Sequence, residues 1–185
     1  MSNPDLSNYQ KAPNGITMVL KPEAADGRLR AKLAEQVKTE SIHIPTGNEV
    51  EQIRAARRAG LTVALAGPPG IGKTTLVTSM AKEENLPLTT IMGDRRSKLY
   101  QVVGHSIDFD GGAMLYMDGP VALAARAKMK SILYIDEAFD LPADVYTSLG
   151  SMLDHRASLI MQETGEELKT PHLSIILAFN PPQID

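Results

Sequence analysis

The chain has 185 residues, 43% hydrophobic and 4% aromatic, which is enough to bury one core built mainly from aliphatic side chains. Its 19 basic and 22 acidic residues give a net charge of −3, so bulk charge does not favour nucleic-acid binding. It has no cysteine, which excludes disulfides, and no apolar run approaches the roughly 18 residues of a membrane span, so we expect a cytoplasmic protein without a signal peptide.

The first part of the chain is expected to be an N-terminal extension, over residues 1–41, that is partly disordered and precedes a core over 42–185. Residues 1–15 are polar and contain several prolines and glycines, which is typical of a disordered or draped arm. A short apolar run at 16–20 predicts a strand. A polar helix is expected over 28–38, and its charges read as a solvated face.

The core is expected to begin with extended chain over 42–47. The next helix starts at Asn48, a residue type that caps helix N-termini, and ends at Gly60. Residues 61–66 then form a short, nearly continuous apolar run, which is typical of a buried strand.

A complete phosphate-binding loop follows this strand. The pattern is a glycine, four free positions and Gly-Lys-Thr, and a helix is expected directly after it, over residues 73–84. Backbone N–H groups of such a loop point at the β-phosphate, Lys73 reaches the β- and γ-phosphates, and the Thr74 hydroxyl binds Mg²⁺. The residues expected to bind ATP are Gly67, Pro68, Pro69, Gly70, Ile71, Gly72, Lys73, Thr74 and Thr75.

Two β-hairpins are expected between the strands of the core. Asp110-Gly111-Gly112 is a strong turn signal between two short strands over 106–109 and 113–117. A second hairpin is expected over 157–170, with its turn at Thr164-Gly165.

Two further apolar runs end in polar side chains at the position where functional residues emerge from parallel strands. Residues 131–136 predict a buried strand, after which Asp136 is expected to hold Mg²⁺ and Glu137 to polarise the attacking water. Residues 173–179 predict another strand, and Asn180 is expected to stand beside Glu137. The alternatives are a solvent-facing acid and an asparagine that ends a strand before a proline pair.

The order of these parts resembles the Walker A, Walker B and sensor 1 elements of an AAA+ ATPase. The segments Val102–His105 and Gly112–Ala124 resemble the corresponding region of MoxR-type ATPases. Leu153–Arg156 and Thr164–Glu166 are similar to the CbbQ, NorQ and GvpN branch and to the related dynein-like domains. The resemblance covers roughly residues 42–182.

The resemblance implies an α/β P-loop NTPase with a parallel sheet in the order 5-1-4-3-2 and helices on both faces. The strands at 61–66, about 87–92, 131–136 and 173–179 correspond to strands 1, 2, 3 and 4. Strand 5, the arginine finger and the helical lid would follow Asn180. The chain is therefore expected to be a truncated core, mostly monomeric and weakly active; the alternatives are that the remainder is supplied elsewhere or that the protein is a minimal divergent form. The first hairpin would either face the pore of a ring or pack on its own domain.

The resemblance also implies a function, namely ATP hydrolysis with Mg²⁺ in a ring that is usually hexameric. Glu137, Lys73 and Asn180 would be the catalytic residues. The ring would remodel or activate a partner protein, such as a metalloenzyme, with a von Willebrand A-type partner. The alternatives are a nucleotide-binding switch with little turnover and, less favoured by charge, a nucleic-acid motor.

Overall fold

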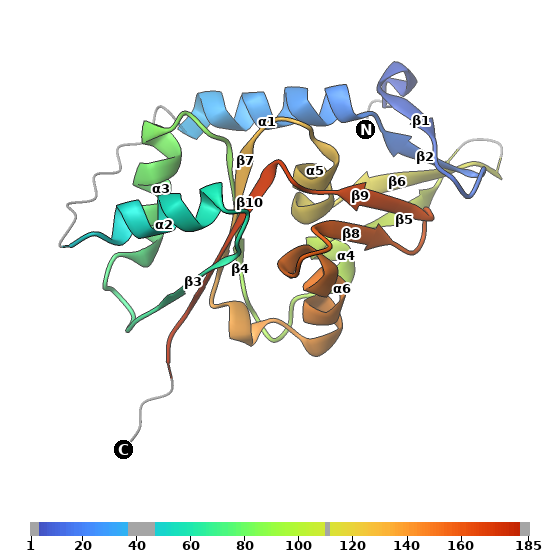
Figure 1. Ribbon diagram of the computed structural model, residues 1–185. Helices are drawn as coiled ribbons and strands as arrows, with labels where there is room; N and C mark the ends of the chain where they lie inside the picture. Colours follow the sequence, from blue (N-terminus) through green and yellow to red (C-terminus); the bar gives the residue numbers. More distant parts are fainter. Residues whose placement is uncertain (1–3, 37–46, 110–111, 182–185) are drawn as a thin grey trace.

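The structure, a computed structural model, describes residues 4–36, 47–109 and 112–181. Its centre is a four-stranded parallel sheet in the order β3-β10-β7-β4 (Figure 1). The bounds of these strands are Val63–Ala66, Leu173–Phe179, Ser131–Asp136 and Leu88–Met92, respectively. All neighbouring strands of this sheet pair in parallel. Their order corresponds to the predicted order 1-4-3-2. The α/β fold class is therefore confirmed.

Helices cover both faces of this sheet, as Figure 1 shows. Successive side chains of a β-strand point to opposite faces of the sheet, so β7 contributes residues to both faces. Ile132 and Tyr134 pack with α2 (Glu49–Arg58) and α3 (Lys73–Glu83) on one face. Leu133 and Ile135 pack on the other face with α5 (Pro120–Arg126) and α6 (Ala143–Leu153). Strand β7 is therefore buried along its whole length, which explains its continuous apolar sequence.

Residues 4–36 of the N-terminal segment form helix and strand and pack on the rest of the molecule. It contains a 3-10 turn (Leu6–Asn8), β1 (Tyr9–Lys11), β2 (Thr17–Leu20) and α1 (Pro22–Gln36). A disordered or a draped arm was expected over residues 1–15. Positions 4–15 fit a draped arm, because β1 pairs with β2. The predicted helix begins earlier than expected, at Pro22, because proline is favoured in the first turn of a helix. Its predicted end at 37–38 lies outside the described residues, as do 42–46.

Both predicted hairpins are present. β5 (Gly104–Asp108) and β6 (Met114–Asp118) form the first, and its predicted turn residues Asp110 and Gly111 lie outside the described positions. β6 also pairs with β2, so this hairpin completes a second sheet in the order β1-β2-β6-β5. The hairpin therefore packs against its own chain. β8 (Ser158–Met161) and β9 (Glu166–Lys169) form the second hairpin.

Several helical segments have no counterpart among the elements predicted from the sequence. These are α4, the 3-10 turn η3, α5 and α6, with α4 spanning Leu99–Val102 and η3 spanning Ala138–Asp140. A proline near the start of α5 and another just before α6 are local signals that could have located both helices. None of the helices in the described part of the chain has the length and hydrophobicity of a membrane-spanning segment.

A buried ion network joins both hairpins to α5. The Arg126 guanidinium donates from Nε to Asp118 Oδ2 at 2.9 Å and from Nη1 to Glu166 Oε1 at 2.6 Å. Asp118 belongs to β6 and Glu166 to β9, and the side chains of Arg126 and Asp118 are only 2% and 1% exposed. Since burial shields this network from bulk solvent, removing the cation leaves two carboxylates buried without a counter-charge.

We expect Arg126→Met to lower the free energy of unfolding by about 3–5 kcal/mol, the typical cost of breaking a buried ion pair. Urea denaturation followed by circular dichroism measures this change. Lys169→Met is the matched control, because Lys169 forms an exposed ion pair with Glu167 and should change stability by no more than about 1 kcal/mol. Equal effects of the two substitutions would contradict the importance of the buried network.

Candidate nucleotide-binding site

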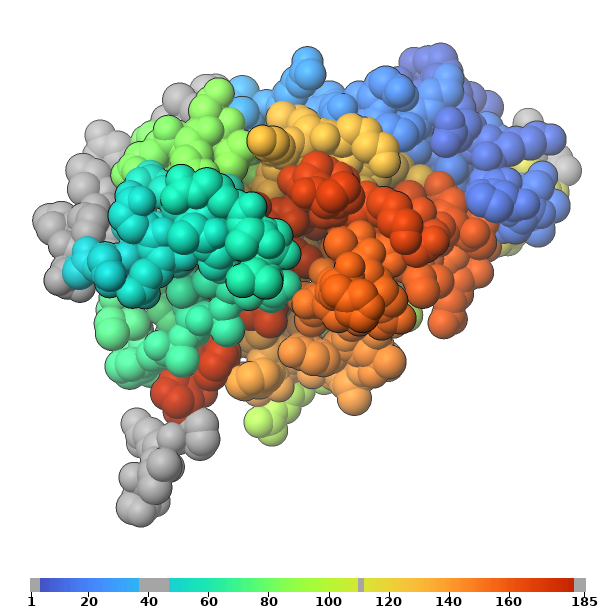
Figure 2. Space-filling model, viewed as in Figure 1, coloured from blue at the N-terminus to red at the C-terminus, as the bar shows by residue number. Residues whose placement is uncertain are grey.

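The predicted site residues lie at the carboxyl ends of the central strands, where ligands of open α/β sheets bind. The loop of residues 67–72 leaves β3 and leads into α3, and the Gly67 N–H donates to the carbonyl of Phe179 at the end of β10 (3.3 Å). Figure 2 shows the same arrangement on the surface, where the chain between β3 and α3 adjoins the red end of β10. The loop is thereby attached to the strand that precedes Asn180.

Two glycines give the loop its curvature. Gly70 (φ +79°) and Gly72 (φ +94°) adopt left-handed conformations that other residues rarely take. Apart from neighbouring residues of the chain, no atom lies within 4 Å of the position that a Cβ would occupy at either glycine, so no other part of the molecule packs against the loop at these two positions. Gly72 also caps the N-terminus of α3, whose first N–H groups carry positive partial charge. This cradle fits a phosphate group.

Lys73 is held inside the loop at the start of α3. Its Nζ donates to the carbonyl oxygens of Gly67 (2.6 Å) and Pro68 (3.2 Å). It also donates to Oδ1 of Asn180 at 2.9 Å. The ammonium group therefore links the loop to the end of β10.

Thr74 contacts two residues of β7. Its hydroxyl donates to Asp136 Oδ2 at 2.8 Å and lies 3.3 Å from the hydroxyl of Tyr134. Burial raises the pKa of Tyr134 to about 12, so the phenol stays protonated at neutral pH. Because the single Thr74 proton is given to Asp136, the Tyr134 hydroxyl is the donor in their contact.

The pair of Thr74 and Asp136 suits Mg²⁺, because this ion prefers oxygen ligands. The described residues contain no group of three or more histidines, cysteines or acidic residues that could hold a metal ion by themselves. One or two protein oxygens are the usual protein contribution to a Mg²⁺ site, and water and phosphate oxygens complete it.

Glu137 directly follows the end of β7 and contacts Asn180. The Asn180 Nδ2 donates to Glu137 Oε1 at 2.7 Å. Glu137 has a positive φ of 49°, which is uncommon for a residue with a side chain, and its N–H donates to Asp136 Oδ1 at 3.1 Å. Asn180 thus contacts both Lys73 and Glu137 through its two amide atoms.

The structure therefore brings Lys73, Thr74, Asp136, Glu137 and Asn180 together. The other residues predicted to bind ATP lie along the loop and in the first turn of α3. Among them, the side chains of Pro68, Pro69, Ile71 and Thr75 are exposed. Tyr134 was not predicted as a site residue, although its position two residues before Asp136 places both side chains on the same face of β7.

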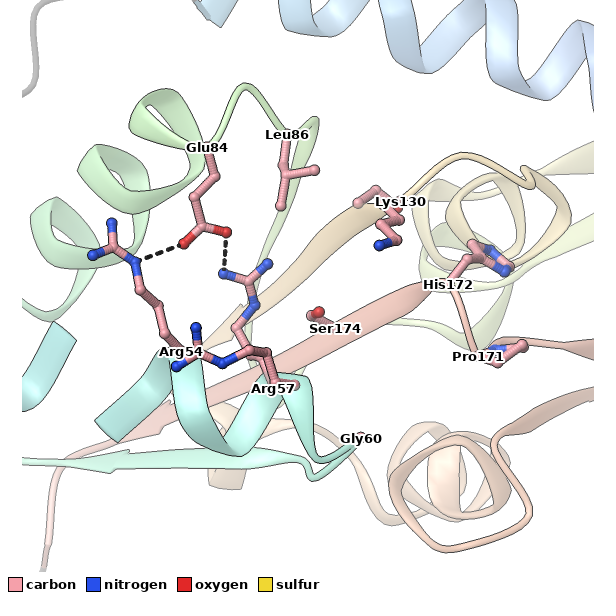
Figure 3. A pocket seen from close by; sticks show the side chains of 11 residues that line it. Arg54, Arg57, Gly60, Glu84, Leu86, Lys130, Pro171, His172 and Ser174 are labelled. Atoms are coloured by element: carbon pink, nitrogen blue, oxygen red, sulfur yellow. Dashed lines mark hydrogen bonds and ion pairs between the residues drawn. The ribbon is translucent and has the colours of Figure 1, made fainter. Parts of the chain in front are cut away.

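A different concave region lies at the opposite end of the sheet. A cavity of about 640 Å³ is lined by the amino ends of β7 and β10 and by the last turn of α2 (Figure 3). Its lining includes Arg57, Lys130, His172 and Ser174 but no residue of the phosphate-binding loop. We therefore do not place a nucleotide there.

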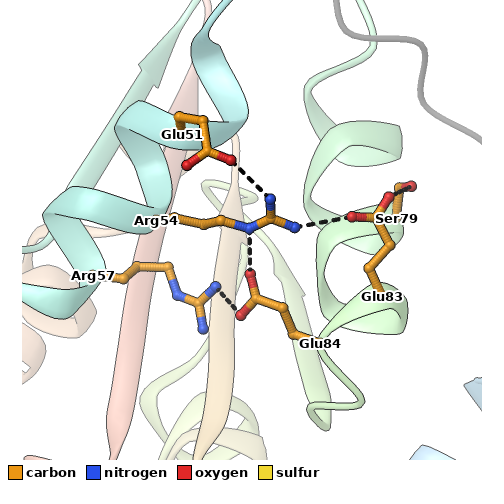
Figure 4. Close-up of polar contacts among 6 residues, drawn as sticks. All are labelled: Glu51, Arg54, Arg57, Ser79, Glu83 and Glu84. Atoms are coloured by element: carbon orange, nitrogen blue, oxygen red, sulfur yellow. Dashed lines mark hydrogen bonds and ion pairs between the residues drawn. The ribbon is translucent and has the colours of Figure 1, made fainter.

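The cations beside this cavity connect two helices. Arg54 and Arg57 of α2 both pair with Glu84, which follows the last residue of α3, at 3.1 and 2.7 Å (Figure 4). Arg54 also pairs with Glu51 and Glu83 at 3.1 and 3.0 Å. The Arg54 guanidinium is thus paired with three glutamates, and these ion pairs hold α2 against α3.

Comparison with known proteins agrees with this geometry. A family model described as "AAA domain (dynein-related subfamily)" matches residues 62–185. The fold is similar to that of a Cytophaga hutchinsonii protein of known structure, with a TM-score of 0.53 and 21% identity over 88% of this chain and 47% of that one.

Three curated relatives are similar over most of the chain. Denitrification regulatory protein NirQ of Pseudomonas aeruginosa is 34% identical over 74% of this chain and 52% of its own length. Protein NorQ of Paracoccus denitrificans is 33% identical over 76% and 51%, and protein CbbQ of Hydrogenophilus thermoluteolus 30% identical over 78% and 54%. The chain thus spans about half the length of these relatives. Together, the family match and the geometry of the loop show that this chain belongs to the dynein-related subfamily of AAA domains and is of the NirQ, NorQ and CbbQ type.

Proposed function

We propose that the chain binds MgATP at the loop of residues 67–74 and hydrolyses the bond between the β- and γ-phosphates. The observation that carries this proposal is the position of Asn180. Its side chain contacts Lys73 at 2.9 Å and Glu137 at 2.7 Å, so one amide joins the phosphate-binding cation to the carboxylate. Such a connection is expected where a phosphate and an attacking water meet.

Binding of ATP would use the loop and the start of α3. The phosphates would be held by loop N–H groups, by the N-terminal end of α3 and by the Lys73 ammonium, which would exchange its contacts with Gly67 and Pro68 for phosphate oxygens. Thr74 and Asp136 would hold Mg²⁺, whose charge would offset that of the β- and γ-phosphate oxygens. The Tyr134 hydroxyl would keep Thr74 oriented toward Asp136.

Hydrolysis would be assisted by Glu137. Its carboxylate would polarise a water molecule for attack on the γ-phosphorus and accept the proton that the water loses, so that ADP and inorganic phosphate form. Asn180 would orient both the carboxylate and the γ-phosphate. In this arrangement, each polar group comes from a rigid strand end or from the first turn of a helix, which limits the reorganisation needed for reaction.

The biological role proposed for the whole protein is remodelling or activation of a partner protein, for example a metalloenzyme, by a ring that contains six copies and acts with a von Willebrand A-type partner. Support comes from the curated relatives, of which NirQ is described as a regulatory protein of denitrification.

We expect the chain to hydrolyse ATP only when Mg²⁺ is present. Phosphate release in the presence of Mg²⁺ and in the presence of EDTA measures this. Asp136→Asn should lower turnover by about 10-fold or more and raise the Mg²⁺ concentration needed, because a neutral amide binds the cation less strongly. Asp144→Asn is the matched control, since this carboxylate is exposed on α6. Release that survives both EDTA and Asp136→Asn would refute the proposed site. Tight Mg²⁺-dependent ATP binding without turnover would instead favour a nucleotide-binding switch.

A further inference from the structure

Gly93 lies against the backbone of Glu137. The last pair of the β4–β7 ladder is Met92 with Asp136, so the next residues of the two strands emerge side by side. The Gly93 N–H donates to the carbonyl oxygen of Asp136 at 2.7 Å, which extends the ladder by one bond. Gly93 is buried and directly precedes Asp94, where the chain turns away.

This approach leaves no room for a side chain at position 93. A Cβ there would overlap the carbonyl oxygen of Glu137 and would lie 2.8 Å from its carbonyl carbon and 3.1 Å from the Asp136 carbonyl oxygen. The atoms it would meet are backbone atoms, which cannot swing aside as a flexible side chain can. The backbone angles of Gly93 are not the reason for the glycine, because its φ is not left-handed. Close approach is therefore what requires glycine here.

Glu137 itself needs external support. Its left-handed conformation (φ 49°, ψ 45°) is costly for a residue with a side chain and persists only where neighbours hold it. Several contacts at this junction do so. The Asn180 amide holds the carboxylate, the Asp140 N–H donates to the Glu137 carbonyl oxygen at 2.9 Å, and Gly93 packs against the same carbonyl group. The side chain of Glu137 takes its direction from this backbone.

We propose that Gly93 is a positioning residue for ATP hydrolysis, because its bare Cα allows β4 to approach Glu137 and fixes the direction of the Glu137 carboxylate. This inference rests on the proposed function of Glu137. A methyl group at position 93 would push the backbone at 137 away, or push the outer strand β4 outward and break the bond from Gly93 to Asp136. In either case the carboxylate would move relative to Lys73 and Thr74, while the phosphate-binding loop would stay unchanged.

We expect Gly93→Ala to lower kcat by at least about 100-fold, the scale of a lost general base, while the Kd for ATP changes by no more than about threefold. Phosphate release and binding of a fluorescent ATP analogue measure the two quantities. Gly27→Ala is the matched control, since a Cβ at Gly27 meets no atom within 4 Å, and it should leave both unchanged. Loss of ATP binding in step with turnover, or full turnover of Gly93→Ala, would overturn the proposal.

A double-mutant cycle tests whether Gly93 acts through Glu137. In the Glu137→Gln background, Gly93→Ala should lower turnover by less than about threefold, because the group that it positions is already gone. A further 100-fold loss in that background would show that Gly93 affects turnover by another route and would overturn the inference.

One measurement does not depend on activity. In ¹H–¹⁵N NMR spectra, the side-chain amide of Asn180 should shift in Gly93→Ala toward its position in Glu137→Ala, and it should stay in place in Gly27→Ala. If the unchanged chain does not hydrolyse ATP, the proposed function fails, and these resonances still test the inference. An unmoved Asn180 resonance in a folded Gly93→Ala variant refutes the inference alone.

Should Gly93→Ala not fold, hydrogen exchange of the unchanged chain provides the test. The bond from the Gly93 N–H to Asp136 predicts that this amide exchanges as slowly as those amides of β4 that point toward β7. Exchange as fast as that of the exposed residue Arg95 would overturn the proposal.

Discussion

Replacement of Glu137 by glutamine is expected to slow ATP hydrolysis by about 10²- to 10⁴-fold, the usual contribution of a general base. Glutamine keeps the size of the side chain and can still accept a hydrogen bond from the Asn180 amide, so the local structure should survive. It cannot accept a proton from water as a carboxylate does. ATP binding should therefore be retained, and the variant should hold unhydrolysed nucleotide.

Single-turnover phosphate release and binding of an ATP analogue distinguish these two effects. Glu23→Gln on α1 makes the same chemical change at an exposed position and serves as the control. Turnover of Glu137→Gln equal to that of the unchanged chain would show that another group activates the water.

Replacement of Lys73 by alanine is expected to weaken ATP binding by about 100-fold or more, because a hydrogen bond to a charged group contributes about 1.5–3 kcal/mol and the phosphates also lose their nearest cation. The structure adds a second consequence. Lys73 also contacts Asn180, so its removal frees the Asn180 carbonyl oxygen and loosens the link to Glu137. Residual turnover at saturating ATP should therefore fall as well.

Equilibrium binding of a labelled ATP analogue checks the first effect, and turnover at high ATP concentration checks the second. Lys128→Ala removes an exposed lysine far from the loop and is the control. Thermal denaturation of both variants should show that the fold is kept. Undiminished affinity in Lys73→Ala would mean that the nucleotide does not bind at this loop.

The sequence predicted best those features that depend on a short, continuous stretch of residues. The continuous apolar run of β7 reflects burial on both faces, and the glycine spacing of the loop reflects the local backbone path. The strand order could be predicted because the resemblance to AAA+ ATPases supplied it. No local pattern in the four strands states which of them are neighbours.

What sequence could not predict depends on contacts between distant segments. Gly93 resembles any glycine after a strand, and its role appears only when the register of β4 against β7 places it beside Glu137. Arg126 likewise resembles an ordinary arginine at the end of a helix. Its two carboxylate partners lie on different hairpins, and nothing in the spacing of the chain indicates that they meet. The strand β1 was missed because three residues give too short a pattern.

The Arg126 network has a mechanical consequence. One planar guanidinium pairs with a carboxylate from each hairpin. These ion pairs therefore oppose any displacement of one hairpin relative to the other or to the end of α5. α5 packs on the same face of the sheet as Leu133 and Ile135, the β7 residues that precede Asp136. A molecule that displaced either hairpin would therefore also act on α5, which packs against the strand that ends at Asp136, directly before Glu137.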